Sequence, residues 1–381
     1  MNILVVCHYG LYQDLTFSFV HNQVREFAAM GHRVRVISPN GLGKTGRDGR
    51  RLGKSLLVSA ADGAELYDLR YVTLSAYGEK HFNLHSAVSS IRFHWKKLFR
   101  DFTPDVIHAH TLGFDSEIGA WLKEKFSCPL VVTTHGSDTA VPLAKGQHDT
   151  LCSACNKADA VVAVSSVLRE KVRTCGTTTR LEAILNGFVP RDIPADIPRD
   201  PYHIIQVGHL IPLKRTDVTI RAFAKLKNHY PQLHLTVIGQ GPQHEALENL
   251  CRELHVADSV RFLGQIPNEA VFREMCSATY FVMVSKPEGL GIVYLEAMAA
   301  GCVTVGTEDE GISDVIRHGE NGYLVPADDP DAIVRIIANG LTSPSSVSTA
   351  AECGYWDARK LTWGKNAETY LSLFQVLTSM N

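Results

Sequence analysis

The sequence lacks a long hydrophobic run and a strong net charge. No stretch approaches about 18 uninterrupted apolar residues, so nothing in it is expected to span a bilayer. Its start, Met1 to Gly10, has neither the charged region nor the apolar region of a signal peptide. The formal net charge is −2, so no global field draws the protein to nucleic acid or membrane. We therefore expect a cytoplasmic protein that binds no nucleic acid, with any membrane contact confined to a local patch.

The sequence also lacks a disulfide framework. Its nine cysteines are scattered and odd in number, which predicts reduced thiols in a cytoplasm. Cys152 and Cys155 form the one close pair, and His148 lies four residues upstream. A metal or redox site is one interpretation, but no second cysteine pair completes a zinc site. The spacing also fits one turn of a helix, and we favour that structural interpretation.

A dinucleotide-binding fingerprint is missing as well. Gly239 and Gly241 follow a predicted strand and permit close approach of another backbone. However, His244 stands in place of the third glycine, and no suitable acid follows at the usual distance. A dehydrogenase is therefore disfavoured.

What the sequence has is strand–helix alternation in two blocks. The chain has 381 residues, 45% of them apolar and 20% charged, which suits a globular protein of two domains. The alternation predicts α/β domains, each a Rossmann-like, doubly wound parallel sheet. We place them at residues 1–185 and 186–362, with a proline-rich linker at Asn186–Pro201 and a polar loop at Ser343–Ser348. The predicted strands are Ile3–Cys7, Val34–Ser38, Asp105–His110, Leu130–Thr134, Ala160–Ser165, His203–Val207, His234–Ile238, Val260–Leu263, Thr279–Ser285 and Val303–Gly306.

Polar residues cluster just after these strands. Because ligands bind at the carboxyl ends of parallel strands, two such domains facing each other predict a ligand cleft. One segment contains two glutamates separated by seven residues: Glu288 in a glycine-flanked turn, and Glu296 on a helix expected to start near Gly291. The N–H groups and dipole of such a helix start bind phosphate, and a carboxylate there accepts hydrogen bonds from sugar hydroxyls. The alternative is a helix cap and an exposed surface glutamate.

The run around these glutamates resembles glycosyltransferase family 4. It reads Glu288-Gly-Leu-Gly, then Leu295-Glu-Ala-Met-Ala-Ala-Gly301. Members are retaining, nucleotide-sugar-dependent enzymes of the GT-B fold. The resemblance implies an N-terminal acceptor-binding domain and a C-terminal donor-binding domain. It also implies a final helix, within residues 363–381, that returns to the N-terminal domain.

The resemblance assigns a diphosphate-binding cation to the second domain. Members usually read Gly-Arg-Leu-x3-Lys-Gly after its first strand, and Lys214 matches the lysine that grips the donor diphosphate. His209 stands where arginine is usual and Arg215 where glycine is usual, so Arg215 is a candidate for the missing cation. Fixed cations lower the barrier because the leaving diphosphate gains negative charge.

The remaining donor contacts are also implied by the resemblance. Glu296 resembles the glutamate that binds the ribose hydroxyls, and Glu288 resembles the one beside the transferred sugar. The other expected contacts are Gly289, Leu290 and Gly291 at the distal phosphate, Gln265 and Ile266 at the nucleobase, and Gly239 and Gly241 after the second strand.

In the first domain, Thr133-x-His135-Gly-x-Asp138 resembles the family's histidine motif. His135 is expected beside the anomeric centre, where it bonds the sugar and stabilises the transition state. Asp138 is expected to orient His135 or its loop, and His110 to line the acceptor side. Most members carry a Gly-Gly pair after the first strand. Only Gly10 is present here, so we expect this loop to recognise the acceptor.

No Asp-x-Asp motif sits at a predicted strand end, so the metal-chelating device of GT-A transferases is absent. We expect a metal-independent reaction without a cofactor, in which Lys214 and the helix dipole neutralise the diphosphate of a UDP- or GDP-linked sugar. In a same-face mechanism a leaving phosphate oxygen takes the acceptor's proton, so no general base is required.

Two basic stretches in the acceptor-side domain predict a membrane face. Lys44–Lys54 has five cations and one acid, and Arg92–Arg100 mixes cations with Trp95, Leu98 and Phe99. Basic aromatic segments bind anionic lipid, which predicts peripheral contact with the inner face of the plasma membrane. The alternative is a helix whose apolar face packs on its own domain.

The sequence therefore predicts a retaining hexosyltransferase that acts on a glycan or lipid-linked acceptor in surface polysaccharide or glycolipid biosynthesis. Two alternatives stay open: a sugar-nucleotide epimerase on the same fold, and a catalytically weak paralogue that binds nucleotide sugar. His209 and the missing Gly-Gly pair keep the second alternative open.

Overall fold

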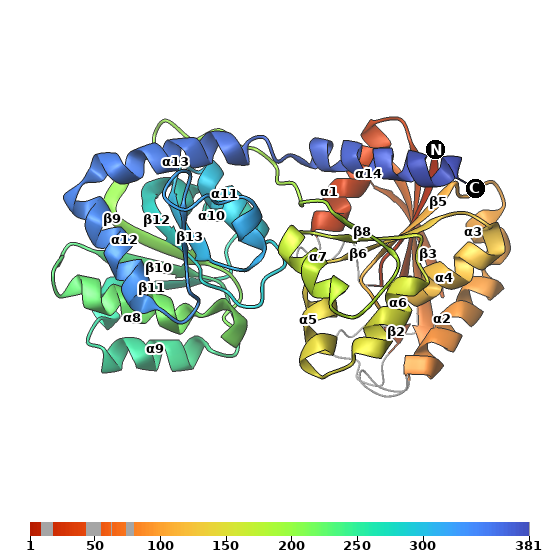
Figure 1. Ribbon diagram of the computed structural model, residues 1–381, viewed down its shortest axis with the longest axis horizontal. Helices are drawn as coiled ribbons and strands as arrows, with labels where there is room; N and C mark the ends of the chain where they lie inside the picture. Colours follow the sequence, from red (N-terminus) through yellow and green to blue (C-terminus); the bar gives the residue numbers. More distant parts are fainter. Residues whose placement is uncertain (9–17, 43–54, 62, 74–79, 381) are drawn as a thin grey trace. The chain divides into compact units, whose positions relative to one another are not determined.

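The computed structural model describes residues 1–8, 18–42, 55–61, 63–73 and 80–380. The chain divides into two compact units, Met1–Leu185 with Trp363–Asn381, and Asn186–Thr362 (Figure 1). We call them the N-terminal unit and the C-terminal unit. Each unit is built on one β-sheet with helices against it, which is the α/β arrangement that the sequence predicts.

The N-terminal unit contains an eight-stranded sheet with the order β3-β4-β2-β1-β5-β6-β7-β8. All neighbouring strands are parallel except β3 and β4, which form an antiparallel hairpin at one edge. The elements are β1 (Asn2–Val6), α1 (Ser18–Ala29), β2 (Arg33–Leu42), β3 (Leu56–Ala61), β4 (Ala64–Val72), α2 (Lys80–Phe93), α3 (Trp95–Phe99), β5 (Val106–His110), α4 (Phe114–Phe126), β6 (Leu130–Thr134), α5 (Ser137–Ala144), α6 (His148–Asn156), β7 (Ala160–Ala163), α7 (Ser166–Arg173), β8 (Arg180–Ala183) and α14 (Trp363–Ser379).

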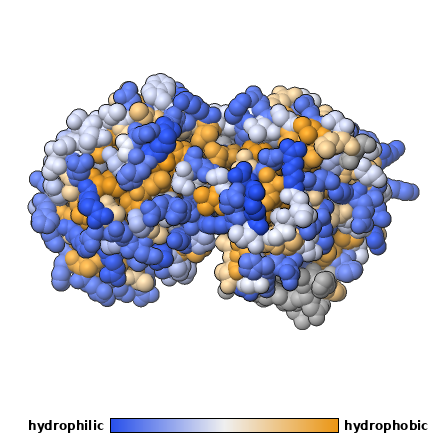
Figure 2. Space-filling view, viewed as in Figure 1, coloured by the Kyte–Doolittle hydropathy of each residue, from blue (hydrophilic) through white to orange (hydrophobic). Residues whose placement is uncertain are grey.

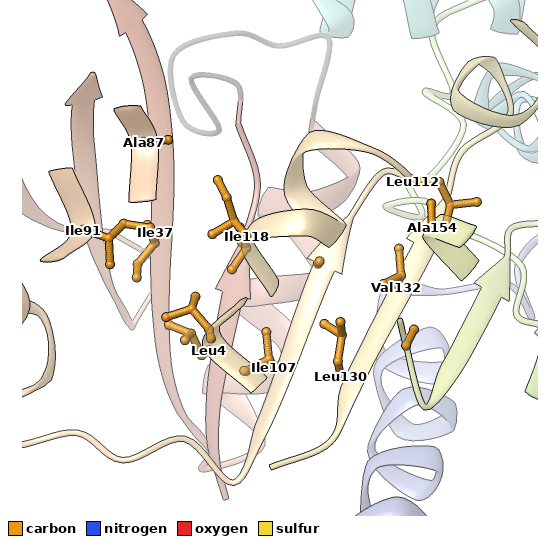
Figure 3. Packing of buried hydrophobic residues seen from close by; sticks show 14 of the residues in the cluster. Leu4, Ile37, Ala87, Ile91, Ile107, Leu112, Ile118, Leu130, Val132 and Ala154 are labelled. Atoms are coloured by element: carbon orange, nitrogen blue, oxygen red, sulfur yellow. The ribbon is translucent and has the colours of Figure 1, made fainter. Parts of the chain in front are cut away.

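Both faces of this sheet are buried, as β1 illustrates. Successive side chains of a strand point to opposite faces, so β1 contributes to two separate hydrophobic clusters. Leu4 and Val6 belong to a cluster that includes residues of α2, α4 and α6 (Figure 3), whereas Ile3 and Val5 belong to one that includes residues of α1 and α14. A strand buried on both faces reads as a continuous apolar run, which is why β1 is visible in the sequence.

The last helix belongs to the N-terminal unit. The side chain of Asn366 accepts a hydrogen bond from Gln23 of α1 at 2.7 Å and donates one to the carbonyl of Leu185 at 2.8 Å. The hydroxyl of Tyr370 lies 2.8 Å from that of Thr133 on β6. The helix therefore closes the α1 face of the sheet.

The C-terminal unit contains a six-stranded, all-parallel sheet with the order β11-β10-β9-β12-β13-β14. Counted along the chain, this is the 3-2-1-4-5-6 order of a Rossmann fold. The elements are β9 (Asp200–Val207), η2 (Pro212–Lys214), α8 (Thr216–Lys227), β10 (His234–Ile238), α9 (His244–Glu253), η3 (Ala257–Ser259), β11 (Val260–Gly264), α10 (Asn268–Ser277), β12 (Ala278–Val282), α11 (Ile292–Ala299), β13 (Val303–Thr307), η4 (Gly311–Asp314), β14 (Tyr323–Val325), α12 (Pro330–Thr342) and α13 (Pro344–Ala358).

Five elements differ from the sequence-based expectation. The strands β3, β4, β8 and β14 were not predicted, and the expected polar loop at Ser343–Ser348 is wrong because α13 starts at Pro344. Proline is favoured in the first turn of a helix, where its missing N–H costs no hydrogen bond.

Within the described residues, no helix is both long enough and apolar enough to cross a membrane. The face shown in Figure 2 is largely hydrophilic with scattered apolar areas.

The loops at the carboxyl ends of β9 and β10 pack backbone against backbone. The N–H of Gly208 donates to Ile238, and that of Leu210 donates to Gln240. A Cβ atom on Gly239 would lie 1.9 Å from the carbonyl oxygen of Gly208, so only glycine fits there. This close approach fixes the relative position of the two loops, whose backbone forms part of the candidate site.

We expect Gly239→Ala to destabilise the C-terminal unit by at least about 2 kcal/mol more than Gly264→Ala, because a clash with the backbone of Gly208 must be relieved. Gly264 is the matched control, since it also has a positive φ (+63°) but open space around its Cβ position. Calorimetric or urea unfolding of the two variants measures the difference. Equal losses would show that the clash is not the constraint.

Candidate active site

Lys214 and Glu288 form an ion pair at the carboxyl edge of the C-terminal sheet. Lys214 ends η2, which follows β9, and Glu288 lies in the loop after β12. The N–H of Lys286 donates to the carbonyl of Leu213 at 2.8 Å and so holds the two loops together. The Lys214 ammonium lies 2.5 Å from Glu288 Oε2, with both side chains largely shielded from solvent. Two residues that sequence analysis assigned to the diphosphate and the sugar are thus in direct contact.

Two further residues hold Glu288 in place. The Ser285 hydroxyl donates to Glu288 Oε2 at 2.7 Å, and the N–H of Glu288 donates to the buried carboxylate of Glu310 at 2.9 Å. Sequence analysis missed both residues. The available signal was their position, because Ser285 ends the predicted β12 region and Glu310 follows β13 within a run of acids.

The start of α11 lies next to this pair. Gly291 is the residue before the helix and adopts φ +76°, and a Cβ on it would lie 2.7 Å from the ring of Tyr294. The first N–H groups of an α-helix have no carbonyl partner inside the helix, and the dipole is positive there. The segment Gly289–Gly291 therefore leads into an end suited to a phosphate.

Arg215 and Lys214 pair with different acids. Arg215 adopts φ +50°, the region that favours the glycine usual at this position, and its Nη1 lies 2.7 Å from Asp328 Oδ1. Its charge is therefore already paired. His209 is exposed at the start of the same loop.

The residues expected at the nucleobase lie on the loops after β10 and β11. The amide of Gln240 donates to the side-chain oxygen of Gln265 at 2.6 Å, and the N–H of Gly239 donates to Gly264 at 2.8 Å. Gly241 packs against the backbone of Leu210, where a Cβ would lie 2.4 Å from the carbonyl oxygen. Ile266, next to Gln265, is half-buried.

Glu296 is half-buried on the flank of α11, so the exposed surface position that was the alternative is not what the structure has. It lines a small cavity with residues of α10 and of the linker, including Phe272 and Arg191. Burial raises the pKa of Glu296 to about 7, although the positive charge of Arg191 opposes the shift. Its carboxyl group therefore changes charge near neutral pH.

In the N-terminal unit, His135 follows β6 and approaches His110 at the end of β5. Their facing nitrogens, His135 Nε2 and His110 Nδ1, are 3.2 Å apart and their rings are nearly parallel. Burial lowers the pKa of His135 to about 4 and that of His110 well below its ordinary value. Both imidazoles are therefore neutral at pH 7, and His135 is suited to hydrogen bonding rather than to carrying charge.

Asp138 orients the loop that carries His135. Its Oδ1 accepts the N–H groups of His135 and Gly136 at 3.0 Å each, and its Oδ2 accepts the N–H of Leu112 at 2.8 Å. Sequence analysis expected Asp138 to orient either the His135 side chain or its loop. In the structure its carboxylate binds the backbone of the loop.

A third histidine lies at this edge, and sequence analysis missed it. His8 follows β1, and its Nδ1 lies 2.7 Å from Oδ2 of the buried Asp115 at the start of α4. The two residues are 107 positions apart in the sequence, so no local pattern joins them. Gly10, the residue of this loop that sequence analysis assigned to the acceptor side, lies outside the described residues, as does Lys44–Lys54.

The aromatic residues of the second basic stretch pack inward. Leu98 is fully buried, and Trp95 and Phe99 both contact the ring of Phe126. For these side chains the structure supports the alternative interpretation, in which the apolar face packs on its own domain. Phe93 remains 83% exposed beside the cations of α2 and α3.

Across the part of the chain that the structure describes, no group of three or more His, Cys, Asp or Glu side chains is arranged to hold a metal ion. This includes the neighbourhood of Cys152 and Cys155, which lie one turn apart in α6.

Comparison with known families decides the classification. The model described as Glycosyltransferase Family 4 matches residues 18–191, and the model described as Glycosyl transferases group 1 matches residues 192–355. The chain belongs to glycosyltransferase family 4. The resemblance of the Glu288–Gly301 run is thereby confirmed.

The chain is also similar to a named mannosyltransferase. The GDP-mannose-dependent alpha-(1-6)-phosphatidylinositol monomannoside mannosyltransferase of Mycolicibacterium smegmatis is 28% identical over 254 residues, which cover 61% of this chain and 66% of that enzyme. The chain thus matches just under two thirds of the length of this relative.

Two solved structures resemble the whole chain. Sucrose-phosphate synthase from Thermosynechococcus elongatus has a TM-score of 0.80 at 20% identity and covers 100% of both chains. Anabaena HepE in complex with UDP and glucose has a TM-score of 0.74 at 18% identity and covers 99% of this chain and 100% of its own. The predicted fold class, GT-B with two Rossmann-like, doubly wound domains, is confirmed.

The raised pKa of Glu296 predicts how stability depends on pH. The folded pKa is above the unfolded value, so the protonated carboxyl favours the folded state, and its contribution is lost as pH rises from about 4.5 to about 7. Between pH 5 and pH 8 the wild type should lose on the order of 2 kcal/mol more stability than Glu296→Gln. Urea unfolding at the two pH values measures this, with Glu253→Gln, on an exposed position of α9, as control. Parallel profiles for wild type and Glu296→Gln would contradict the assignment.

Proposed function

We propose that this protein is a retaining glycosyltransferase. It moves a hexose from a UDP- or GDP-linked donor to a glycan or lipid-linked acceptor, without a divalent metal or other cofactor, in surface polysaccharide or glycolipid biosynthesis. The observation that carries the proposal is the Lys214–Glu288 ion pair beside the start of α11. Relatives and structural neighbours that use GDP-mannose or bind UDP support it.

The leaving diphosphate is the part of the donor that this arrangement suits best. When the sugar bond breaks, negative charge builds on the diphosphate, and a nearby ammonium and helix start stabilise it. Lys214 supplies the ammonium and the segment Gly289–Gly291 leads into the helix start. Because a lysine and a helix dipole can do this together, the proposal needs no metal ion.

Glu288 and Glu296 would hold the two sugars of the donor. A carboxylate accepts hydrogen bonds from hydroxyl groups, so Glu288 is assigned to the transferred hexose and Glu296 to the ribose. The ribose would bind best to the ionised form of Glu296. The loops around Gly239, Gly241, Gln265 and Ile266 are assigned to the nucleobase side, where backbone groups are close to the surface.

In the N-terminal unit, His135 is assigned to the transferred sugar, and His110, Asp138 and Gly10 to the acceptor side. The lowered pKa of His135 supports a neutral hydrogen-bonding role. Asp138 acts by bracing the loop.

The ion pair predicts opposite effects for its two partners. Lys214→Ala should weaken UDP or GDP binding by roughly 10- to 100-fold, because a charge-assisted contact to the diphosphate is lost. Glu288→Gln should leave that affinity within about threefold or strengthen it, since it frees Lys214, while sugar transfer falls by at least about 100-fold. Isothermal titration calorimetry and release of nucleoside diphosphate from UDP- and GDP-hexoses measure the two effects.

Arg215→Ala is the matched control, because it removes the neighbouring cation, which pairs with Asp328 and not with Glu288. A loss of affinity in this variant equal to that of Lys214→Ala would contradict the assignment of the diphosphate to Lys214. Conversion of the donor into an isomer without release of diphosphate would instead favour the epimerase alternative. Donor binding without turnover would favour the catalytically weak paralogue.

Peripheral membrane contact is proposed through a basic patch on α2 and α3. The patch consists of Arg92, Phe93, Lys96, Lys97 and Arg100, which are all exposed. A single protruding aromatic ring among cations suits an anionic lipid surface, with the ring in the headgroup region and the cations near phosphates. The contact would bring the N-terminal unit to a lipid-linked acceptor.

Charge reversal tests the patch. Lys96→Glu with Lys97→Glu should weaken binding to phosphatidylserine-containing vesicles by roughly 30-fold or more, since each cation near the surface contributes about 1 kcal/mol. The control reverses two exposed lysines at the end of α13 and the start of α14, Lys360 and Lys365. Vesicle cosedimentation at low and high salt measures the binding. Equal effects of the two double variants would contradict the patch.

A further inference from the structure

The contact between His8 and Asp115 is absent from the assignments above. It lies at the carboxyl edge of the N-terminal sheet, in the same row of strand ends that carries His110 and His135. Asp115 is 0% exposed, and its Oδ2 also accepts the hydroxyl of Thr111 at 3.0 Å. Thr111 adopts φ +86°, so the backbone is in an unfavourable conformation at the point that supports the carboxylate.

The contact fixes which nitrogen of His8 is available to a ligand. A neutral histidine that donates Nδ1–H to a carboxylate carries a lone pair on Nε2. The His8 side chain is 37% exposed, and no described residue forms a hydrogen bond with Nε2. An unpaired carboxylate buried as deeply as that of Asp115 would be costly. Asp115 therefore stays bonded to His8 and fixes the orientation of the imidazole.

A stacked pair of aromatic rings lies beside the imidazole of His8. The ring of Phe114 lies edge to face against that of His8, with 6.1 Å between the ring centroids. It is stacked on the ring of Tyr71, with 5.4 Å between the centroids. Both aromatic rings are half-buried. A hydrogen-bond acceptor next to aromatic carbon suits a ring that has both hydroxyl groups and a C–H face, as sugars and cyclitols do.

We propose that His8, oriented by Asp115, is an acceptor-binding residue whose Nε2 accepts a hydrogen bond from a hydroxyl of a polyhydroxylated ring. The inference rests on the proposed glycosyltransferase function and names a residue for its acceptor side. His8 binds and orients the acceptor, and the proton of the attacking hydroxyl leaves with the diphosphate oxygen. Asp115 is a positioning residue, since it acts through the imidazole.

His8→Asn is the decisive variant. The asparagine amide can still donate to Asp115 but has no atom at the place of Nε2. With saturating UDP- or GDP-hexose, and with free hexoses, p-nitrophenyl hexosides and myo-inositol as acceptors, the acceptor KM should rise about tenfold or more. The donor KM, the rate at which water hydrolyses the donor to nucleoside diphosphate and the melting temperature should stay near those of the wild type.

Three comparisons separate binding from folding. His8→Gln carries its amide closer to the place of Nε2 and should recover part of the acceptor affinity. Asp115→Asn should raise the acceptor KM because the tautomer of His8 is no longer enforced. His148→Asn, at an exposed position at the start of α6, should change nothing. An unchanged acceptor KM in His8→Asn, or an equal rise in donor KM, would overturn the inference.

The pH dependence gives an independent measurement. The charges of Asp115 on α4 and Asp138 on α5 raise the pKa of His8, while Tyr71 on β4, whose pKa burial raises to about 12, stays neutral. Acceptor KM should therefore rise as pH falls through the raised pKa of His8, and this rise should be absent in His8→Asn. If the wild type transfers sugar to no acceptor, the proposed function fails. If it transfers sugar with the same pH profile as His8→Asn, only the inference fails.

Discussion

The ion pair between Lys214 and Glu288 is the interaction on which the account of the C-terminal unit depends. It joins the loop after β9 to the loop after β12 and places a cation and a carboxylate on the same edge of the sheet. A shielded ion pair adds little to stability, because both groups give up contact with water. Its consequence is positional: the ammonium is held beside the start of α11 by the carboxylate, and such preorganisation is what the proposed diphosphate site requires.

Close backbone packing makes this arrangement rigid. Three glycines in the loops after β10 and β13 leave no room for a Cβ: Gly239 faces Gly208, Gly241 faces Leu210, and Gly311 faces Gly289 at a Cβ-to-oxygen distance of 1.8 Å. Such contacts bring N–H and C=O groups to the surface without side chains in between. They connect the loop after β9 to that after β10, and the loop after β12 to that after β13.

Much of the fold follows from the sequence because buried parallel strands and amphipathic helices leave local patterns. The core strands of both sheets, the helix α1 and the start of α11 at Gly291 are readable in this way. The hairpin of β3 and β4 and the short strand β14 are not, because edge strands are only partly buried and lose the continuous apolar run. The first turn of α13 is hard to recognise because its serines are also typical of a loop, although Pro344 is favoured at a helix start.

The residues of the candidate site also divide into those that a local sequence pattern reveals and those that it does not. The glutamates, Lys214 and the His135 motif stand out because their neighbours form a recognisable run. Contacts that join distant segments do not, and three of them change the interpretation. Arg215 is paired with Asp328, Asp138 accepts the backbone N–H of Leu112 rather than a proton from an imidazole, and His8 is held by Asp115. The contacts of His8 and Asp138 are set by sheet topology, which places the ends of β1, β5 and β6 side by side irrespective of their separation along the chain.

The central claim is that a diphosphate leaves and the sugar bond re-forms on the same face, with an ammonium and a helix start in place of a metal ion. The most direct test is ¹H NMR of the anomeric proton of the product during turnover of UDP- and GDP-hexoses in the presence of EDTA. The account predicts undiminished turnover and a product with the anomeric configuration of the donor. An inverted product, or turnover that EDTA abolishes and Mg²⁺ restores, would contradict it.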